Sequence, residues 1–335
     1  MRVSEQFLKC VAFVGEMLDV DVPGDFSGTG FFLSVPPESA RLQAKKERFG
    51  YFVTAKHVAE ELQGRNLYMR VNKVGGGVTD FQNVIGQQWY LHPSDRTADV
   101  AVIPLAGQPN ADIEAIGIEQ LGTPEQLARL QIGIGDEVFS VGLFTPVGEN
   151  TSTNIPIVRY GTIAMMPPEQ IQTDLGYADA YIVEARSLGG LSGSPVFARP
   201  TMKIDIPEVC GINKMLGVAP GSILLGVMQS HWDVKESEMN EVHFVNDRKR
   251  GVNYGMAVVV PASKILDILN RPELVQMRID VEKHKLQRKV AVPGMDSAKH
   301  DQETQITPAG AEIPIPTQEQ FLDDLTKVSR KIKPD

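Results

Sequence analysis

The sequence predicts an all-β fold. Up to about residue 260 the chain consists of short runs of four to seven residues, rich in Val, Ile, Phe and Tyr and separated by turn residues. Strands and helices do not alternate regularly, so a parallel doubly wound sheet is not expected. A fixed-period repeat is also absent from the sequence. The clearest candidate strands are residues 30–35, 51–54, 66–71, 100–105, 137–141, 157–160, 180–183 and 222–228.

A hairpin turn and three short helices are expected between these strands. The Gly-Gly-Gly run at 75–77 predicts the turn, because glycine tolerates the backbone angles of a tight turn. Helices are expected over residues 55–62, directly after a strand, and over residues 123–130, which a Thr-Pro pair opens. The third helix is expected over residues 262–269.

The C-terminal end of the chain differs in composition from the rest. After about residue 276 it is polar and contains several Pro and Gly residues. Such a segment buries too little apolar surface to fold, so we expect a disordered tail. Near its end, residues 318–332 place Phe321, Leu322 and Leu325 at helical spacing and predict a terminal amphipathic helix. The sequence leaves open whether that helix docks on its own chain or on a partner protein.

Charge and composition exclude several classes of function. The formal net charge of −9 argues against a general nucleic-acid binder, and the basic clusters at 248–250 and 283–289 are interpreted as a solvated loop and linker. No apolar run reaches the roughly 18 residues of a membrane-spanning helix, so no membrane partner is expected. Residues 1–28 lack the apolar stretch and cleavage site of a signal peptide. The two cysteines, Cys10 and Cys210, make no disulfide framework, and we expect a cytoplasmic protein.

Three segments carry chemically reactive side chains. His57 follows a predicted strand, where a rigid backbone can hold an outward-pointing ring. Asp99 opens an apolar strand, and burying its carboxylate there costs several kcal/mol unless a partner compensates. Ser192 lies in the Gly-rich segment 189–197, which permits a sharp turn and the close approach of a carbonyl group. Taken singly, each has a plainer explanation: a structural histidine, a turn-capping aspartate and an ordinary Gly/Ser loop.

Together, in the chain order His, Asp, Ser, these residues resemble the catalytic triad of the chymotrypsin-like (trypsin-fold) serine peptidases. Within that family the resemblance is to the HtrA-like branch. It covers roughly residues 10–270, because four further segments match the family in order. These segments are residues 27–31, 134–142, 160–163 and 254–261.

The resemblance implies two packed antiparallel six-stranded β-barrels with short helices. An N-terminal barrel within residues 1–120 is expected to carry His57 and Asp99. A C-terminal barrel within residues 121–275 is expected to carry Ser192. The remaining residues, 276–335, form the polar tail, which is too short for the PDZ domain of HtrA proteins.

The resemblance also implies a serine endopeptidase that cleaves a protein or peptide substrate through an acyl-enzyme intermediate. Ser192 is then the nucleophile and His57 the general base, while Asp99 orients the histidine. The amides of Gly190 and Ser192 form the oxyanion hole. Neither a cofactor nor a metal is expected, since the sequence contains no HExxH or CxxC motif.

Substrate selection stays open at this level. By resemblance, Arg186 lies at the base of the primary specificity pocket, where it would favour an acidic residue before the cleaved bond. The same side chain can equally pair with Glu184 and face solvent. Gln229, Ser230 and His231 lie, by resemblance, on the strand that pairs with the substrate backbone.

The sequence departs from the family pattern in three places. Leu191 takes the position of an acidic residue that pairs with a freed N-terminal amine in many secreted members, so that activation mechanism is not expected. Ser194 replaces a common glycine. Residues 201–221 form an insertion to which the sequence assigns no role.

Two other classes of protein fit parts of the pattern. A catalytically silent binding or scaffold protein could share the trypsin fold, since a fold does not guarantee chemistry, but the complete set of His57, Asp99 and Ser192 argues against it. An α/β-hydrolase fits the Gly-x-Ser sequence at the nucleophile. However, Ser194 breaks its G-x-S-x-G motif, and its Asp and His would follow the serine in the chain.

Overall fold

The chain divides into two compact units in the computed structural model. The first consists of Met1–Ser34, Tyr51–Ile103 and Asn110–Arg271, and the second of Val35–Gly50, Pro104–Pro109 and Pro272–Asp335. The residues that the structure describes are 3–19, 22–81, 88–106, 108, 110–143, 152–167, 170–173, 175–185, 191–200, 222–234, 252–287, 304–306 and 312–314.

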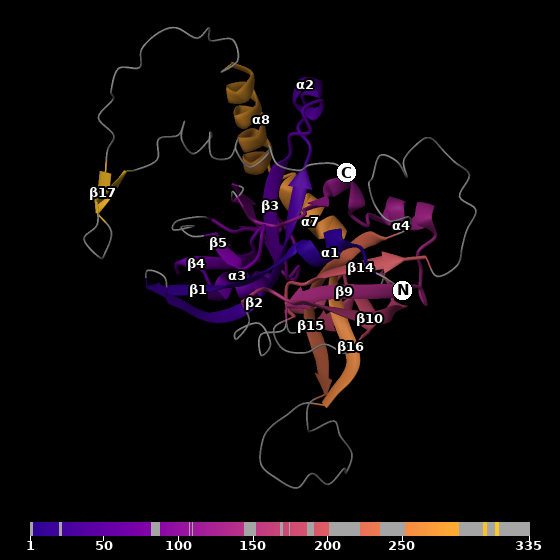
Figure 1. Cartoon of the computed structure of the whole chain (residues 1–335). Helices are drawn as coiled ribbons and strands as arrows, with labels where there is room; N and C mark the ends of the chain where they lie inside the picture. The colour runs from indigo at the N-terminus through magenta and orange to yellow at the C-terminus, as the bar shows by residue number, and fades with distance from the viewer. Residues whose placement is uncertain are drawn as a thin grey trace. The chain divides into compact units, whose positions relative to one another are not determined.

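The strands of the N-terminal half belong to one β-sheet (Figure 1). They are β1 (Val11–Asp19), β2 (Val22–Val35), β3 (Phe49–Thr54), β4 (Leu67–Asn72), β5 (Val78–Phe81), β6 (Tyr90–Leu91), β7 (Ala101–Leu105) and β8 (Ile116–Gly117). Their order is β5-β4-β1-β2-β3-β7-β6, and β8 pairs in parallel with β2. The register between β1 and β2 shifts around Gly15 and Met17, and such irregularities bend and twist a strand.

This sheet is not closed among the described residues, so the expected first six-stranded barrel is not confirmed. The sheet has eight strands, and β5 and β6 are the two ends of its order. Closure would require these two strands to pair. The segment that joins them, residues 82–87, lies outside the described part of the chain, and β6 has only two residues with which to pair.

The C-terminal half is a closed barrel of six antiparallel strands, as expected (Figure 1). Its strands are β9 (Glu137–Leu143), β10 (Pro156–Met165), β13 (Tyr181–Glu184), β14 (Pro195–Arg199), β15 (Ile223–Val234) and β16 (Val252–Pro261). Every second residue of a strand points to the same face. Residues 181, 183 and 185 accordingly belong to one buried cluster, together with Val138, Ile163, Leu225 and Val259. This cluster is the core of the barrel.

Helix α1 (Glu5–Lys9) joins the N-terminal segment to the barrel through Phe7. The ring centroid of Phe7 lies 5.5 Å from that of Phe139 and 4.4 Å from that of Phe197. Because the neighbouring Val138 belongs to the barrel core, Phe139 lies on the outer face of the barrel. Aromatic pairs of this kind add about 0.5–1.5 kcal/mol each beyond the area that they bury.

The three predicted helices and the hairpin are confirmed. The helices are α3 (Lys56–Glu61), α4 (Pro124–Leu130) and α7 (Ala262–Leu269). Thr123 caps α4, since its side chain accepts a hydrogen bond from Gln126 N at 3.3 Å. The turn between β4 and β5 uses Gly75, Gly76 and Gly77, all with positive φ. The remaining elements are α2 (Ala40–Gln43), the 3-10 helix η1 (Ile118–Gln120), β11 (Ile171–Thr173), β12 (Gly176–Ala178), α8 (Pro272–Gln287), β17 (Thr304–Ile306) and β18 (Glu312–Pro314).

Helix α8 contradicts the expectation that the tail is disordered from residue 276. It continues to Gln287 and belongs to the second unit. Lys285 Nζ lies 2.8 Å from Glu47 Oε2 in a nearly buried ion pair. The Glu282 carboxylate accepts hydrogen bonds from the backbone N–H groups of the two residues before α2. These partners are far away in the sequence, so the composition of the tail alone does not reveal them.

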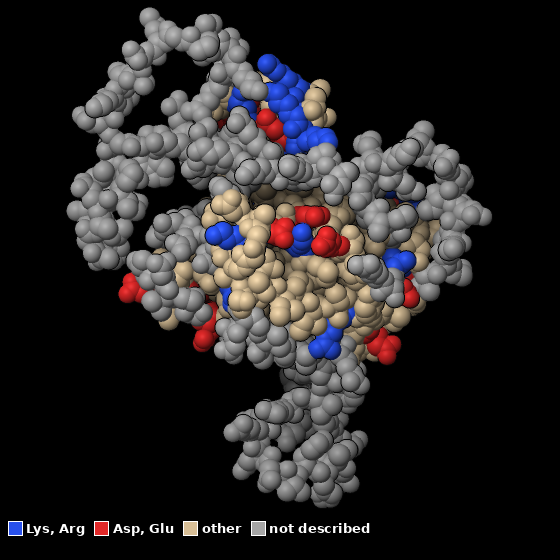
Figure 2. Space-filling view, viewed as in Figure 1, with Lys and Arg blue, Asp and Glu red and all other residues tan. Residues whose placement is uncertain are grey.

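Two predicted features, the 201–221 insertion and the terminal helix at 318–332, lie outside the described residues. On the face shown in Figure 2, the described Lys and Arg side chains gather over α2 and are otherwise mixed with Asp and Glu. None of the helices in the described ranges is both long and apolar enough to span a membrane.

Candidate active site

His57 lies at the corner where strand β3 gives way to helix α3. The strand ends at Thr54 and the helix begins at Lys56. The residues on either side, Thr54, Ala55 and Val58, are buried, whereas the His57 side chain is 47% exposed. The corner therefore holds the imidazole at the surface on an immobilised backbone.

Asp99 is buried and binds His57 through both carboxylate oxygens. Its side chain is 1% exposed. Oδ1 accepts a hydrogen bond from the His57 backbone N–H at 2.9 Å, and Oδ2 lies 2.8 Å from His57 Nδ1. An ionised carboxylate can only accept, so Nδ1 carries the hydrogen and Nε2 is left as an acceptor. The pair thus selects the tautomer that a general base requires.

The same contact changes the basicity of the ring. The hydrogen bond that His57 donates to Asp99 raises the pKa of His57 above its ordinary value of 6.5, although burial opposes this effect. The negative charges of Glu61 and Glu60 raise the pKa further. A nearby carboxylate stabilises the protonated imidazolium, which gives the shift its direction.

Ser192 lies in a turn that backbone hydrogen bonds tie to both halves of the first unit. Its carbonyl accepts from Thr29 N at 3.0 Å, which fixes it to β2. Gly193 N donates to Met228 O at 2.8 Å, and Met228 N donates to Ser194 O at 2.9 Å, which fix the turn to β15. Within the described ranges, the Ser192 N–H donates to no acceptor.

Thr29 connects the Ser192 turn to the strand that leads to His57. It is fully buried. Its carbonyl accepts from Thr54 Oγ1 at 2.7 Å, and its hydroxyl accepts from Leu143 N at 3.3 Å. The ends of β3 and β9 and the Ser192 turn therefore all hydrogen-bond to one residue of β2.

Gly193 allows the Ser192 turn to approach α3 closely. Its φ is +84°, and a Cβ at this position would collide with Thr29 O and Thr54 Oγ1 and lie 3.0 Å from Ala55 N. The Ser192 turn is thus packed against the backbone that leads to His57. No hydrogen bond joins Ser192 to His57 among the described residues, and bonds between base and nucleophile are often long until substrate binds.

Leu191 and Ser194 are packing residues on either side of this turn. They are 2% and 0% exposed. Both lie against Gly142, because a Cβ there would collide with Leu191 Cδ2 and lie 2.5 Å from Ser194 Oγ. The Ser194 hydroxyl has no hydrogen-bond partner in the described part of the chain. The buried side chain at position 191 is thus the apolar leucine and not the acidic residue that the sequence comparison considered there.

The remaining predicted site residues are described only in part. Arg186 and Gly190 lie outside the described residues. Ser230 and His231 lie on β15, and their side chains are not described. Gln229 is 5% exposed, and none of the described residues forms a hydrogen bond with its Oε1. A buried amide acceptor is thus available one residue after Met228, which binds the Ser192 turn.

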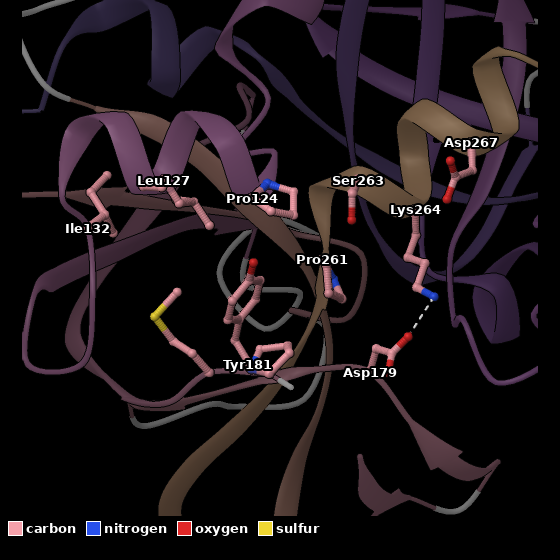
Figure 3. Close-up of a pocket in the computed structure, with 12 residues that line it drawn as sticks. Pro124, Leu127, Ile132, Asp179, Tyr181, Pro261, Ser263, Lys264 and Asp267 are labelled. Atoms are coloured by element: carbon pink, nitrogen blue, oxygen red, sulfur yellow. Dashed lines mark hydrogen bonds and ion pairs between the residues drawn. The ribbon is translucent and has the colours of Figure 1, made fainter. Parts of the chain in front are cut away.

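A pocket of about 430 Å³ lies between α4, α7 and β13 (Figure 3). Leu127 and Ile132 form an apolar part of its lining, and Lys264 and Asp267 form a charged part. Burial raises the pKa of Tyr181, which also lines it, to about 12. The lining contains none of the triad candidates, so this pocket is separate from the candidate active site.

The structure is similar to solved protease domains. One is the MamO protease domain from Magnetospirillum magneticum, with a TM-score of 0.47 and 14% identity over 80% of this chain and 100% of that one. Another is the Rv3671c protease from M. tuberculosis in its active form, with a TM-score of 0.38 and 15% identity over 78% of this chain and 80% of that one. The sequence matches no protein-family model and no curated protein.

Sequence reasoning missed the role of Thr29. It lies in the Gly-rich segment 27–31, which the sequence analysis singled out, but only the fold brings Thr54, Leu143 and Ser192 around it. The available signal was a hydroxyl side chain between two glycines that precede an apolar strand.

The packing of Gly193 predicts that Gly193→Ala destabilises the protein more than a glycine replacement in open space. Gly76 is the matched control, because it also has positive φ, at +104°, but a Cβ there meets no atom within 4 Å. Gly76→Ala should cost the backbone strain alone, roughly 1–2 kcal/mol. Gly193→Ala should cost about 1–3 kcal/mol more, since its Cβ overpacks the turn. Equal losses in urea denaturation would contradict the packing of the Ser192 turn.

The Asp99 contact predicts that His57 titrates above pH 6.5. A raised folded-state pKa means that the pair contributes fully to stability below the unfolded pKa and loses that contribution as pH rises through the folded one. Asp99→Asn should lower the His57 midpoint, measured by NMR titration of the ring, because it removes the largest cause of the shift. Glu61→Gln is the control and should lower the midpoint less. A midpoint that Asp99→Asn leaves unchanged would refute the assigned contact.

Proposed function

We propose that this protein is a serine endopeptidase with a trypsin-like fold and that His57, Asp99 and Ser192 form its catalytic triad. One observation carries the proposal: the buried Asp99 carboxylate binds both the backbone N–H and Nδ1 of a half-exposed histidine. A histidine oriented in this way by a third group is the usual activator of a serine nucleophile. The packing of the Ser192 turn against the residues before His57 supports Ser192 as that nucleophile.

The proposed reaction begins with attack on the scissile carbonyl. Ser192 Oγ forms a bond to the carbonyl carbon while its proton moves to His57 Nε2. The carbonyl π electrons move to the oxygen, and the resulting oxyanion is held by the amides of Gly190 and Ser192. Each such donor is typically worth a factor of about 10² to 10³ in kcat. Among the described residues the N–H of Ser192 has no acceptor, which supports this role for one of the two donors.

The tetrahedral intermediate then collapses to an acyl-enzyme. The bond from carbon to the leaving nitrogen breaks, and His57 delivers its proton to that nitrogen. Water then attacks the acyl carbon while His57 Nε2 takes a proton from it. The ester bond from that carbon to Ser192 Oγ breaks, and His57 returns the proton to Ser192 Oγ. Asp99 stabilises the imidazolium throughout, and its contact with Nδ1 keeps Nε2 directed to the reaction.

The finer architecture follows from the same proposal. The open N-terminal sheet is proposed to be the counterpart of the first barrel of trypsin-like peptidases, with residues 1–120 and 121–275 as the two catalytic domains. Within the trypsin-like peptidases, we propose that the protein is of the HtrA-like type. A cytoplasmic location is also proposed, and the burial of Cys10, which raises the pKa of its thiol, fits a structural thiol in a reducing compartment.

Substrate residues are proposed to meet β15 and the segment after β13. Ser230 and His231 would pair with the substrate backbone. Gln229 would offer its unpartnered Oε1 to a substrate N–H donor. Arg186 would form the base of the primary pocket and select an acidic residue before the cleaved bond.

Ser192→Ala should abolish both peptidase activity and labelling by a fluorophosphonate probe. Loss of a triad nucleophile reduces kcat on the order of 10⁴-fold or more. Ser194→Ala is the matched control in the same turn, because the Ser194 hydroxyl is buried and unpartnered, and this variant should still be labelled. Wild-type protein that resists the probe and cleaves no peptide library would favour the silent binding protein. If the fluorophosphonate probe labels the Ser192→Ala variant, Ser192 is not the nucleophile.

The proposed role of Arg186 predicts cleavage after Glu or Asp. A charge-assisted contact of about 1.5–3 kcal/mol corresponds to roughly a ten- to hundredfold preference over neutral residues. Arg186→Ala should erase this preference in a peptide-library cleavage profile and leave probe labelling of Ser192 intact. If the wild-type protein and Arg186→Ala both select aliphatic residues before the cleaved bond, Arg186 faces solvent. The primary pocket would then be formed by Gln229 and its neighbours.

A further inference from the structure

Helix α7 presents a row of polar residues that the proposed mechanism does not use. Lys264, Asp267 and Arg271 are spaced three and four residues apart, so they lie along one side of the helix and the turn after it. The opposite side, which includes Ile265 and Leu269, is fully buried. Figure 3 shows Lys264 extending from α7 toward Asp179 of the barrel side.

The partners of this row lie on the segment that leads to Asp99. Arg271 Nη1 donates to Leu91 O at 2.9 Å, and its guanidinium carbon lies 5.7 Å from the centroid of the Tyr90 ring. One turn earlier on the helix, Asp267 Oδ2 lies 3.1 Å from His92 Nε2. The helix and the segment therefore run in opposite directions and contact each other pair by pair.

Of the three residues in this row, Lys264 contacts the residue closest to Asp99 in the sequence, namely Asp95. Its ammonium group is 2.7 Å from Asp95 Oδ2 and 3.0 Å from Asp179 Oδ2, and its side chain is 14% exposed. Burial would raise the pKa of Asp95, but hydrogen bonds from Lys264 and Thr97 outweigh that effect and lower the pKa to about 2. Asp95 is therefore ionised at any pH at which a histidine base works, and the bridge persists there.

Asp95 transmits this restraint along the chain toward Asp99. Its Oδ1 accepts from Thr97 N at 2.9 Å and from Thr97 Oγ1 at 2.6 Å. On the other side of the segment, Lys56 Nζ donates to Arg96 O at 3.2 Å. The backbone support of the segment is slight, since β6 and β7 share two residue pairs. The residues before Asp99 are therefore held mainly by side-chain contacts.

We propose that Lys264 is a positioning residue: by holding Asp95, it fixes the direction in which Asp99 presents its carboxylate to His57. It thereby couples the barrel that carries Ser192 to the segment that carries Asp99. This inference rests on the proposed function, because positioning matters for the reaction only if His57 is the base. A misplaced carboxylate would still leave the protein folded but would hold the imidazole less well.

The test compares Lys264→Met with Asp179→Asn. Lys264→Met removes the bridge but keeps an apolar side chain of similar length, whereas Asp179→Asn removes the barrel-side charge and leaves the contact with Asp95. Ring NMR titration of His57 is the first readout, and none of the carboxylates whose charge raises the pKa of His57, namely Asp99, Glu60 and Glu61, is altered. The second readout is kcat and KM on a peptide that the wild-type protein cleaves.

Lys264→Met should lower the His57 midpoint toward its ordinary value and reduce kcat about tenfold, with KM within about twofold of wild type. Asp179→Asn should leave both readouts near wild type. If Lys264→Met does not fold, Asp95→Asn removes the same contact from its other end and carries the comparison. A wild-type midpoint and kcat in the folded variant overturn the proposal.

The two proposals fail in different ways. The titration needs no catalysis, so a wild-type protein that the fluorophosphonate probe does not label would refute the peptidase function while the coupling of Lys264 to His57 could still be measured. A labelled wild-type protein with an unchanged titration in Lys264→Met would refute only the positioning role.

Discussion

The burial of the Asp99 carboxylate constrains the arrangement of the first unit. A buried charge costs several kcal/mol unless hydrogen bonds and an opposite charge compensate, and both oxygens of this carboxylate are used by His57. The segment before β7 must therefore lie against the corner between β3 and α3. Residues Lys264, Asp267 and Arg271, on α7 and the turn after it, contact that segment at Asp95, His92 and Leu91.

Close backbone packing determines where the candidate nucleophile lies. The carbonyl of Ser192 binds Thr29, and the glycine that follows it fits against Thr29 and Thr54 only because it has no Cβ. The same Thr29 binds the end of β9 through its hydroxyl. The N-terminal sheet and the C-terminal barrel thus share one set of hydrogen bonds, and the candidate site exists only where they meet. Neither half carries all three triad candidates.

Ion pairs between distant segments act here as restraints on geometry. Lys264 joins α7 to Asp95 and Asp179 in the first unit, and Lys285 joins α8 to Glu47 in the second. Partly buried pairs of this kind add little net stability, because desolvation offsets much of the attraction. Their geometric demands are strict, however, since an unpaired partner would be left buried. They consequently fix how loops and helices lie without enlarging the hydrophobic core.

The sequence by itself determined the local elements and the chemical candidates. Residue types and turn signals predicted part of each half, namely strands β2, β3, β4, β7, β9, β10, β13 and β15, the Gly75–Gly77 hairpin and helices α3, α4 and α7. These elements depend on neighbours in the chain. Chain order and local motifs also identified His57 and Asp99, which the fold brings within 2.8 Å. Only the tertiary structure decided the pairing of the N-terminal strands, which form no closed barrel among the described residues, the extension of α8 and the contacts of Thr29 and Lys264. Each of these depends on partners that are distant in sequence, and no local pattern records which of many polar residues will meet once the chain has folded.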